Sequence, residues 1–482
     1  MVALINECPV RYHAMNNGQE IAIQDDQQQL TYRQLDSQLT VLAEQLGQQT
    51  TLIACQTRIN KSENNRLVCI ANNSLQLLLL QLLCLRIGWL FCPLNPRFTD
   101  TEIQQRLTLL NSPYCWAEDS SPHIALKTLA INFAFSPVSS KQLTILNINP
   151  LQPCNIIFTS GSSGFPKAIV HHYQNHFFSA KGSQKLIPLQ RDDHNLLSLP
   201  LFHISGYAAV IRTIIAGATI QLSSYPLTYD LIYNRKITHL SLVTTQLIRL
   251  LKDVRFYPQK TSIKHLLLGG SAFSESLLNV LSARSFSYHL SYGCTEMASQ
   301  VATSNNNNKQ LIVLPYRQVK IDGNEIFLRG ETRFIGYFKN NRIIKIPAKE
   351  WISCGDCGQL KGEQLIISGR KDRQFISGGE NIQPEEIETL CLRYNDVENA
   401  YVYPIQDPEY GKRIVLFVAF TTDNPRYFKQ YCAQLEQYLA QRLTSFKRPI
   451  HYLLWPATEG SGKLKVTRQQ FIDSLLKQGL IT

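Results

Sequence analysis

The sequence predicts an α/β protein with a large N-terminal domain, made of layered α/β subdomains plus a β-rich part, and a small α+β C-terminal domain. Helix-like and strand-like patterns alternate from the N-terminus to about residue 300, shorter β-like pieces follow, and helices and strands alternate again from residue 384. Such alternation is typical of largely parallel sheets covered by helices. We expect the two domains to span residues 1–370 and 371–482.

Individual segments justify this fold class in chain order. Residues 31–46 place leucines at helical spacing after a threonine that can cap a helix. The apolar stretch 75–94 is interrupted by polar side chains and ends at Gly88 and Pro93, so we expect a buried helix followed by a strand and no bilayer-spanning helix. Short apolar runs leading into Gly, Ser or Pro predict buried strands whose carboxyl ends feed functional loops. These runs are residues 155–158, 196–199 and 265–268.

A run of four asparagines, residues 305–308, predicts a solvated loop, after which the pattern becomes β-like. The β-like pieces are residues 318–321, 325–328, 342–346 and 364–367. In the C-terminal part the predicted helices are residues 385–394 and 427–443, and the predicted strands are 400–404 and 414–420.

Composition limits the class of protein before any motif is considered. Of 482 residues, 44% are apolar and 17% are charged, which excludes a disordered chain. The formal charge of +12 is spread without a basic run, so we expect no nucleic-acid partner. Twelve scattered cysteines and the absence of a secretory signal pattern indicate a thiol-reduced, cytoplasmic protein without a membrane span.

The stretch 157–167, IFTSGSSGFPK, carries the clearest chemistry. Hydroxyl and backbone N–H groups in such a loop can cradle phosphate oxygens, and the lysine supplies compensating charge. It is no Walker A loop, because Pro166 precedes the lysine and Ala168 follows it. Taken alone, the stretch could also be a Ser/Gly linker.

This loop and further stretches resemble, in order, the motifs of the adenylate-forming superfamily, and in particular its acyl-CoA synthetase branch. The further stretches are residues 30–35 (LTYRQL), 88–94 (GWLFCPL), 200–203 (PLFH), 291–296 (SYGCTE), 351–356 (WISCGD), 369–372 (GRKD) and 378–382 (GGENI). The resemblance spans about residues 30 to 470. It implies an enzyme that activates a carboxylic acid with ATP and Mg²⁺, forms an acyl-adenylate, and transfers the acyl group to CoA.

The resemblance also implies roles for individual residues. Thr295 would contact the α-phosphate and Glu296 would hold Mg²⁺, whereas Asp356 and Arg370 would bind the ribose hydroxyls. Read without the resemblance, these are a helix-start pair, a turn and a surface charge. The remaining nucleotide-binding residues would be Thr159, Ser160, Gly161, Ser162, Ser163, Gly164 and Lys167 at the phosphates, and Gly269, Gly270, Ser271, Tyr292 and Gly293 at the adenine and acyl sites.

The C-terminal domain would act as a mobile lid that carries the terminal catalytic lysine. Residues 456–468 contain one residue more than the family pattern before Gly-Lys, so both Lys463 and Lys465 fit part of that pattern, and we favour Lys465 slightly. Asp372 would be the hinge. Gly378 and Gly379 would line the CoA channel.

Cys354 and Cys357 form a Cys-x-x-Cys pair, which elsewhere can bind zinc or act in redox chemistry. Neither a second cysteine pair nor a histidine pair lies at ligand spacing, so we do not favour a metal site there.

Residues 199–206 (LPLFHISG), 295–300 (TEMASQ) and 377–386 (SGGENIQPEE) narrow the resemblance within the superfamily. They look most like the ligases that join o-succinylbenzoate to CoA in menaquinone biosynthesis. That acid carries a second carboxylate on its ring, which requires a cation or several donors. The candidates are His203, which lies in the aromatic/His switch segment and is also a candidate catalytic residue, Arg212, Ser299 and Gln300. For Arg212 the plain alternative is a surface position on a helix over residues 206–216.

Other readings stay open at this point. One is another aryl- or medium-chain acyl-CoA ligase with the same machinery, and another is a basic nucleotide- or RNA-binding protein. A catalytically inactive homologue is a further alternative, because the lysine motif is irregular. The sequence is compatible with a homodimer.

Overall fold

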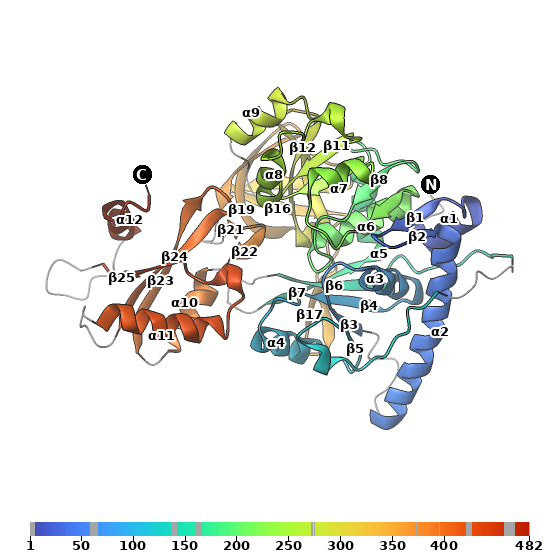
Figure 1. Cartoon of the computed structure of the whole chain (residues 1–482), viewed down its shortest axis with the longest axis horizontal. Helices are drawn as coiled ribbons and strands as arrows, with labels where there is room; N and C mark the ends of the chain where they lie inside the picture. The colour runs from blue at the N-terminus through green and yellow to red at the C-terminus, as the bar shows by residue number, and fades with distance from the viewer. Residues whose placement is uncertain are drawn as a thin grey trace. The chain divides into compact units, whose positions relative to one another are not determined.

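The computed structural model describes residues 5–57, 66–135, 142–159, 166–270, 273, 275–371, 375–382, 384–394, 396–420, 427–456 and 468–481. The chain divides into two compact units (Figure 1). The first comprises residues 1–96, 106–159 and 168–371, and the second comprises residues 97–105, 160–167 and 372–482.

The larger sheet of the first unit changes from parallel to antiparallel pairing at β12. It has 13 strands in the order β15 (Arg317–Asp322), β16 (Glu325–Gly330), β19 (Ile352–Lys361), β20 (Gln364–Arg370), β14 (Leu311–Val313), β13 (Ser299–Ser304), β12 (Tyr288–Cys294), β11 (His265–Leu268), β10 (His239–Leu242), β8 (His194–Leu196), β9 (Thr219–Gln221), β1 (Ile21–Gln24) and β2 (Gln29–Thr31). Strands β8, β10, β11 and β12 are parallel, whereas β12 to β16 pair antiparallel through β13, β14, β20 and β19. The predicted β-rich part is therefore a continuation of the parallel sheet.

The second sheet carries the strand that leads into the stretch predicted to bind phosphate, residues 157–167. Its seven strands are β18 (Arg342–Lys345), β17 (Gly336–Lys339), β7 (Lys167–His172), β6 (Pro153–Thr159), β4 (Leu90–Leu94), β3 (Arg66–Ile70) and β5 (Cys115–Ala117). Strands β6, β4, β3 and β5 are parallel, so Thr159 lies at the carboxyl edge where ligands bind in open α/β sheets.

Helices pack against these sheets, and the apolar periodicity predicts only some of them. Those before residue 300 are α1 (Pro9–Asn16), α2 (Tyr32–Thr57), α3 (Leu75–Ile87), α4 (Asp100–Leu110), α5 (Tyr173–Ser183), α6 (Ile204–Ala216), α7 (Tyr229–Asn234), α8 (Thr244–Leu251) and α9 (Glu275–Ala283). Thr31 caps α2 as expected, because its Oγ1 accepts from Gln34 N at 3.2 Å while Gln34 Oε1 accepts from Thr31 N at 2.8 Å. The buried helix and strand expected over residues 75–94 are confirmed as α3 and β4.

One predicted strand is too long. The run 196–199 contributes only its first residue to β8, and the chain leaves the sheet after Leu197, whose N donates to Gln221 O of β9 at 2.9 Å. There Ser198 N donates to Leu196 O at 2.9 Å, which turns the backbone. The strands expected at 155–158 and 265–268 are confirmed within β6 and β11, and the asparagine run is a turn.

The second unit has its own core. Its strands are β21 (Phe375–Ser377), β22 (Glu380–Ile382), β23 (Val397–Asp407), β24 (Gly411–Phe420) and β25 (His451–Leu454), and its helices are α10 (Pro384–Leu392), α11 (Phe428–Ala440) and α12 (Arg468–Lys477). The apolar faces of α10 and α11 pack with β23 and β24 around Leu416, Leu435 and Leu439, which are fully buried. Within the described residues, every helix is too short or too polar to be a bilayer-spanning segment.

Two glycines that end helices provide a matched test of packing. Gly88 after α3 and Gly217 after α6 both have φ of 74°, a left-handed conformation that costs an L-residue about 1–2 kcal/mol. A Cβ at Gly88 would lie 3.5 Å from its nearest neighbour, whereas at Gly217 it would lie 2.6 Å from the His13 ring.

We therefore expect Gly217→Ala to lower the free energy of unfolding by roughly 1–3 kcal/mol more than Gly88→Ala, because overpacking adds to the backbone strain. Urea unfolding of both variants measures the difference. Equal losses would show that the His13 ring moves aside without cost.

Candidate active site

The site is organised by one hairpin, formed by β12, the short helix η4 (Thr295–Met297) and β13. Its turn is tight, since Ala298 and Ser299 have positive φ of 50° and 97°. Non-glycine residues in this region are strained and cluster at functional sites. Six of the predicted site residues lie on this hairpin: Tyr292, Gly293, Thr295, Glu296, Ser299 and Gln300.

Gly293 is required by close approach of the two hairpin strands. A Cβ on this residue would lie 2.0 Å from the carbonyl oxygen of Ser299. The register between β12 and β13 shifts between Tyr292 and Gly293, which marks a bulge. The glycine therefore allows the chain to turn back tightly enough to bring Ser299 opposite Cys294.

The backbone of η4 is anchored by two residues from other parts of the fold. His171 Nε2 lies 2.7 Å from the carbonyl oxygen of Thr295, and the main-chain N of Phe334 donates to Glu296 O at 2.8 Å. A carbonyl can only accept, so Nε2 carries the proton of the neutral His171 ring. Both contacts hold the main chain, and the half-buried side chains of Thr295 and Glu296 project from a fixed support.

Tyr292 links the hairpin to β19. Its hydroxyl donates to Asp356 Oδ2 at 2.7 Å and lies 3.1 Å from Cys354 Sγ. Burial, together with the neighbouring thiols and carboxylate, raises the pKa of Tyr292 far above its ordinary value, so the hydroxyl remains a donor. Asp356 is itself buried and pairs with Arg370 across β19 and β20, which places the two predicted ribose ligands side by side on the backbone.

The same neighbourhood contains the carboxylate predicted to hold Mg²⁺. Burial raises the pKa of the Cys294 thiol, and the charges of Glu296 and Asp356 raise it further. Mg²⁺ is usually bound by one or two carboxylates plus substrate phosphates and water, so a single glutamate beside a phosphate site fits this ion. In the part of the chain that the structure describes, no three His, Cys, Asp or Glu side chains are grouped to hold a metal by themselves.

Arg212 is buried, so the alternative of a surface position on the helix is wrong. Its side chain is buried because α6 packs against the rest of the unit on most of its faces. Nη1 donates to Gln300 Oε1 at 3.2 Å, and Gln300 Nε2 donates to Thr303 Oγ1 at 2.9 Å, which sets the orientation of the amide. Burial lowers the pKa of Arg212 to about 10.

His203 lies at the opposite end of α6, as its N-cap residue. Arg212 lies nine positions further along the helix, a rise of about 13 Å. Its ring packs edge-on against Phe202 at 4.9 Å. The structure therefore brings Arg212 and Gln300 together and places His203 apart from them along the helix.

Other predicted residues lie at loop ends. Thr159 ends β6, the exposed Lys167 begins β7, and Gly269 and Gly270 follow β11. Gly378 and Gly379, with φ of 58° and 85°, form the two-residue turn between β21 and β22, as is usual for glycines in a tight hairpin. The predicted residues Ser160, Gly161, Ser162, Ser163, Gly164, Ser271, Asp372, Lys463 and Lys465 lie outside the described residues, as does the side chain of Arg370.

Sequence reasoning missed the residues that support this hairpin, His171, Ser179 and Arg317. Ser179 Oγ donates to Ala298 O at 2.7 Å, and Arg317 Nε donates to Gln300 O at 2.8 Å. None of the three belongs to a motif. The one signal for Arg317 is Gly182 within α5, a position where glycine disfavours the helix.

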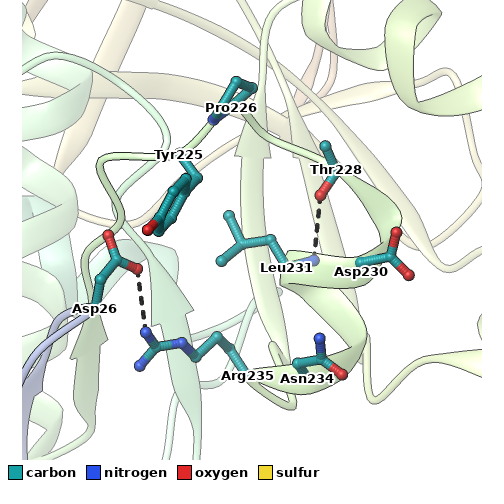
Figure 2. A pocket seen from close by; sticks show the side chains of 8 residues that line it. All are labelled: Asp26, Tyr225, Pro226, Thr228, Asp230, Leu231, Asn234 and Arg235. Atoms are coloured by element: carbon teal, nitrogen blue, oxygen red, sulfur yellow. Dashed lines mark hydrogen bonds and ion pairs between the residues drawn. The ribbon is translucent and has the colours of Figure 1, made fainter.

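A surface pocket of about 430 Å³ lies between the β1–β2 turn and α7 and shares no residue with the predicted site. Asp26 and Arg235 form an ion pair at 3.1 Å on one side of it, with Tyr225 and Leu231 nearby (Figure 2). Asp230, the other charged residue of the lining, pairs with Arg255 at 2.8 Å, so the charged groups of this pocket already have partners within the protein.

Two family models match the chain: "AMP-binding enzyme" over residues 10–326 and "AMP-binding enzyme C-terminal domain" over residues 386–463. The chain belongs to the AMP-binding enzyme family. This confirms the resemblance to the adenylate-forming superfamily, and its solved members confirm the α/β fold with a large N-terminal and a small C-terminal domain.

Relatives in this family match nearly the whole chain. The 2-succinylbenzoate–CoA ligase of Escherichia coli strain K12 is 31% identical over 480 residues, covering 98% of this chain and 100% of the relative. The ligase of the same name from Haemophilus influenzae is 31% identical and covers 90% of this chain and 94% of its own. A variant of E. coli MenE solved with bound OSB-AMS is 29% identical, covers 97% and 98% of the two chains, and has a TM-score of 0.66.

His171 makes the stability of this AMP-binding enzyme depend on pH. Burial lowers its pKa from 6.5 to about 4, so the unfolded chain binds a proton at this residue before the folded chain does. The contribution of His171 to stability is therefore fully present above pH 6.5 and is lost as the pH drops toward 4. At 1.36 kcal/mol per pKa unit, His171 contributes at most about 3 kcal/mol to this loss.

Urea unfolding at pH 7.5 and pH 4.5 should show a smaller acid loss of stability in His171→Gln than in the wild type. The exposed His451 supplies the control, and His451→Gln should retain the wild-type dependence. An unchanged dependence in His171→Gln would contradict the assignment.

Proposed function

We propose that the chain joins 2-succinylbenzoate to CoA through an acyl-adenylate, as an AMP-forming acid–thiol ligase. The observation that carries this proposal is the full-length likeness, at about 30% identity, to 2-succinylbenzoate–CoA ligases of several bacteria. The buried Arg212, held by Gln300, adds a physical reason, because this acid brings a second carboxylate that must be matched when it leaves water.

In the first half-reaction, an oxygen of the succinyl carboxylate attacks the α-phosphorus of ATP, and pyrophosphate leaves. Both reactants are anionic, so the site must supply positive charge and donors where charge develops. Thr295, on its anchored turn, would donate to the α-phosphate, and the loop from Thr159 to Lys167 would hold the β- and γ-phosphates. Glu296 would hold Mg²⁺, which neutralises phosphate charge when bound.

The adenosine would lie beside the hairpin. Asp356, oriented by the Tyr292 hydroxyl, would accept from the ribose hydroxyls, with Arg370 next to it. Gly269, Gly270 and Ser271 would allow the adenine to approach the backbone closely. In the second half-reaction, the CoA sulfur, having lost its proton to water, attacks the acyl carbonyl carbon. The bond between this carbon and the phosphate oxygen breaks, and AMP leaves with the electron pair of that bond.

Arg212 would pair with the ring carboxylate of the acid, with donors from Ser299 and Gln300 completing that side of the pocket. An arginine presents a planar fork of N–H groups that matches a carboxylate. His203, at the other end of α6, would contact the acyl group nearer to the reacting carboxylate.

The C-terminal part, residues 371–482, would act as a lid that turns about Asp372 between the two half-reactions. Its terminal lysine would serve adenylation, and the Gly378–Gly379 turn would serve the CoA channel. The use of ATP and CoA, which are cytoplasmic metabolites, supports a cytoplasmic location for this reaction.

Mass spectrometry of the products tests the function. The purified protein is incubated with ATP, Mg²⁺, CoA and one acid at a time: 2-succinylbenzoate, benzoate, 4-hydroxybenzoate, a cinnamate or a medium-chain fatty acid. We expect the CoA thioester of 2-succinylbenzoate, together with AMP and pyrophosphate, and no comparable thioester of the other acids.

Each other outcome has a defined meaning. A different thioester would replace the substrate and keep the AMP-forming ligase. An acyl-adenylate without thioester would indicate another thiol acceptor, and the absence of every product would favour an inactive homologue.

Two alanine variants should identify the terminal lysine. We expect Lys465→Ala to slow pyrophosphate release by about 10²-fold or more, the usual cost of losing one group that stabilises developing charge. Lys463→Ala, two positions earlier in the sequence, should change this rate by less than about tenfold.

Thioester formation from supplied acyl-adenylate should persist in both variants, because this lysine serves the first half-reaction. If Lys463→Ala slowed pyrophosphate release more than Lys465→Ala, the catalytic role would belong to Lys463.

A further inference from the structure

We propose that Arg317 is a positioning residue for the acid pocket, which both fixes the turn that carries Ser299 and Gln300 and adds a second buried positive charge beside Arg212. The inference rests on the proposed function, since it deepens the recognition of an acid with two carboxylates.

The guanidinium of Arg317 holds the turn through several hydrogen bonds to acceptors on three segments. Nε donates to Gln300 O at 2.8 Å, and Nη2 donates to Ser179 Oγ at 3.0 Å and to Ser179 O at 3.2 Å. Nη1 donates to Pro315 O at 2.8 Å and to Phe178 O at 3.4 Å. The forked shape of the group is used in full, and a lysine could not reproduce it.

These hydrogen bonds bracket the strained part of the hairpin. Ser179, which Arg317 contacts, in turn donates to Ala298 O at 2.7 Å, so Ala298 and Gln300 are held from the same side. Between them lies Ser299, with φ of 97°. Removing Arg317 would release the turn that places the side chain of Gln300 against Arg212.

Arg317 and Arg212 are also neighbouring buried cations. Arg212 donates to the side-chain oxygen of Gln300 and Arg317 donates to its main-chain oxygen, so one residue connects the two. Both side chains are buried, and within the described residues neither guanidinium donates to a carboxylate. Burying charge without a counter-ion is costly, and burial together with the Arg212 charge lowers the pKa of Arg317 to about 9.

The local sequence makes room for this arrangement. A Cβ at Gly182 would lie 2.0 Å from Nη1 of Arg317 and 2.7 Å from Pro315 O. Glycine within a helix costs about 1 kcal/mol relative to alanine. In α5, glycine at this position leaves the space that the guanidinium of Arg317 occupies. The packing of the helix and the position of Arg317 therefore depend on the same residue.

Holding carbonyl groups in place requires hydrogen-bond donors, but it does not require a net positive charge. Within the described residues, Arg212 and Arg317 donate to uncharged oxygen atoms and to no carboxylate. An anion that arrives with the substrate would explain why two positive charges are buried next to each other. The second carboxylate of a dicarboxylic acid would be attracted by these two positive charges. An acid with one carboxylate would interact only with the reacting end of the site.

The test compares 2-succinylbenzoate with 3-benzoylpropionate, the same acid without its ring carboxylate. In Arg317→Met we expect KM for 2-succinylbenzoate to rise at least tenfold and KM for ATP to change less than twofold. The preference in kcat/KM for the dicarboxylate should fall at least tenfold. Arg317→Lys, which keeps the charge without the fork, should recover part of that preference.

Arg284 supplies a matched control. It donates to the carbonyl oxygens of Leu251, Asp253 and Phe256 in another part of the unit, so Arg284→Met removes a comparable carbonyl clamp. We expect Arg284→Met to lower the melting temperature and leave both ratios unchanged. If Arg317→Met does not fold, Gly182→Ala displaces the same guanidinium and should give the same change in preference.

Parallel changes in KM for the acid and ATP, or an unchanged preference in Arg317→Met or its substitute, would overturn the inference. Such a result with active wild type leaves the proposed function intact. A wild type that forms no thioester from 2-succinylbenzoate would overturn the proposed function itself, and the charge preference with it.

Discussion

The site depends on a backbone reversal that the polypeptide does not favour by itself. The hairpin from Tyr292 to Gln300 turns through two residues with positive φ, and its strands approach so closely at Gly293 that a Cβ would overlap a carbonyl oxygen. Hydrogen bonds from β7, α5 and β15 offset this strain by holding the main chain. The side chains that we propose to be catalytic would then need little reorganisation, which is what electrostatic catalysis requires of its donors and ligands.

The hairpin connects two proposed half-sites whose other residues lie far apart in the sequence. One face of the hairpin meets β19 through the hydroxyl of Tyr292 and the carboxylate of Asp356, which would bind the nucleotide. The other end meets α6 through Gln300 and Arg212, which would bind the acid. A rigid turn between them would fix the distance between the α-phosphate and the acid, and positioning of this kind can supply a large part of the rate.

Patterns in the sequence predicted the fold class, several of the helices and strands, and six candidate residues that the structure places on one hairpin, because apolar periodicity and short motifs can be recognised from neighbouring residues alone. The length of β8 was not predictable, since the turn at Ser198 is decided by a hydrogen bond and not by hydropathy. The sequence also gave no reason to prefer a buried Arg212 over an exposed one. Its burial depends on which face of α6 packs inward, and Arg317 reaches the pocket from a strand that belongs to no motif.

The alternation of side chains along β13 has a consequence for the evolution of this enzyme. Successive residues of a strand point to opposite faces, so shifting the register by one position exchanges them. A single residue inserted between Thr295 and Ala298 would turn the amide of Gln300 away from α6 and bring its neighbour there instead. Homologues that change their acid should therefore differ in the side chains of this turn and conserve its length.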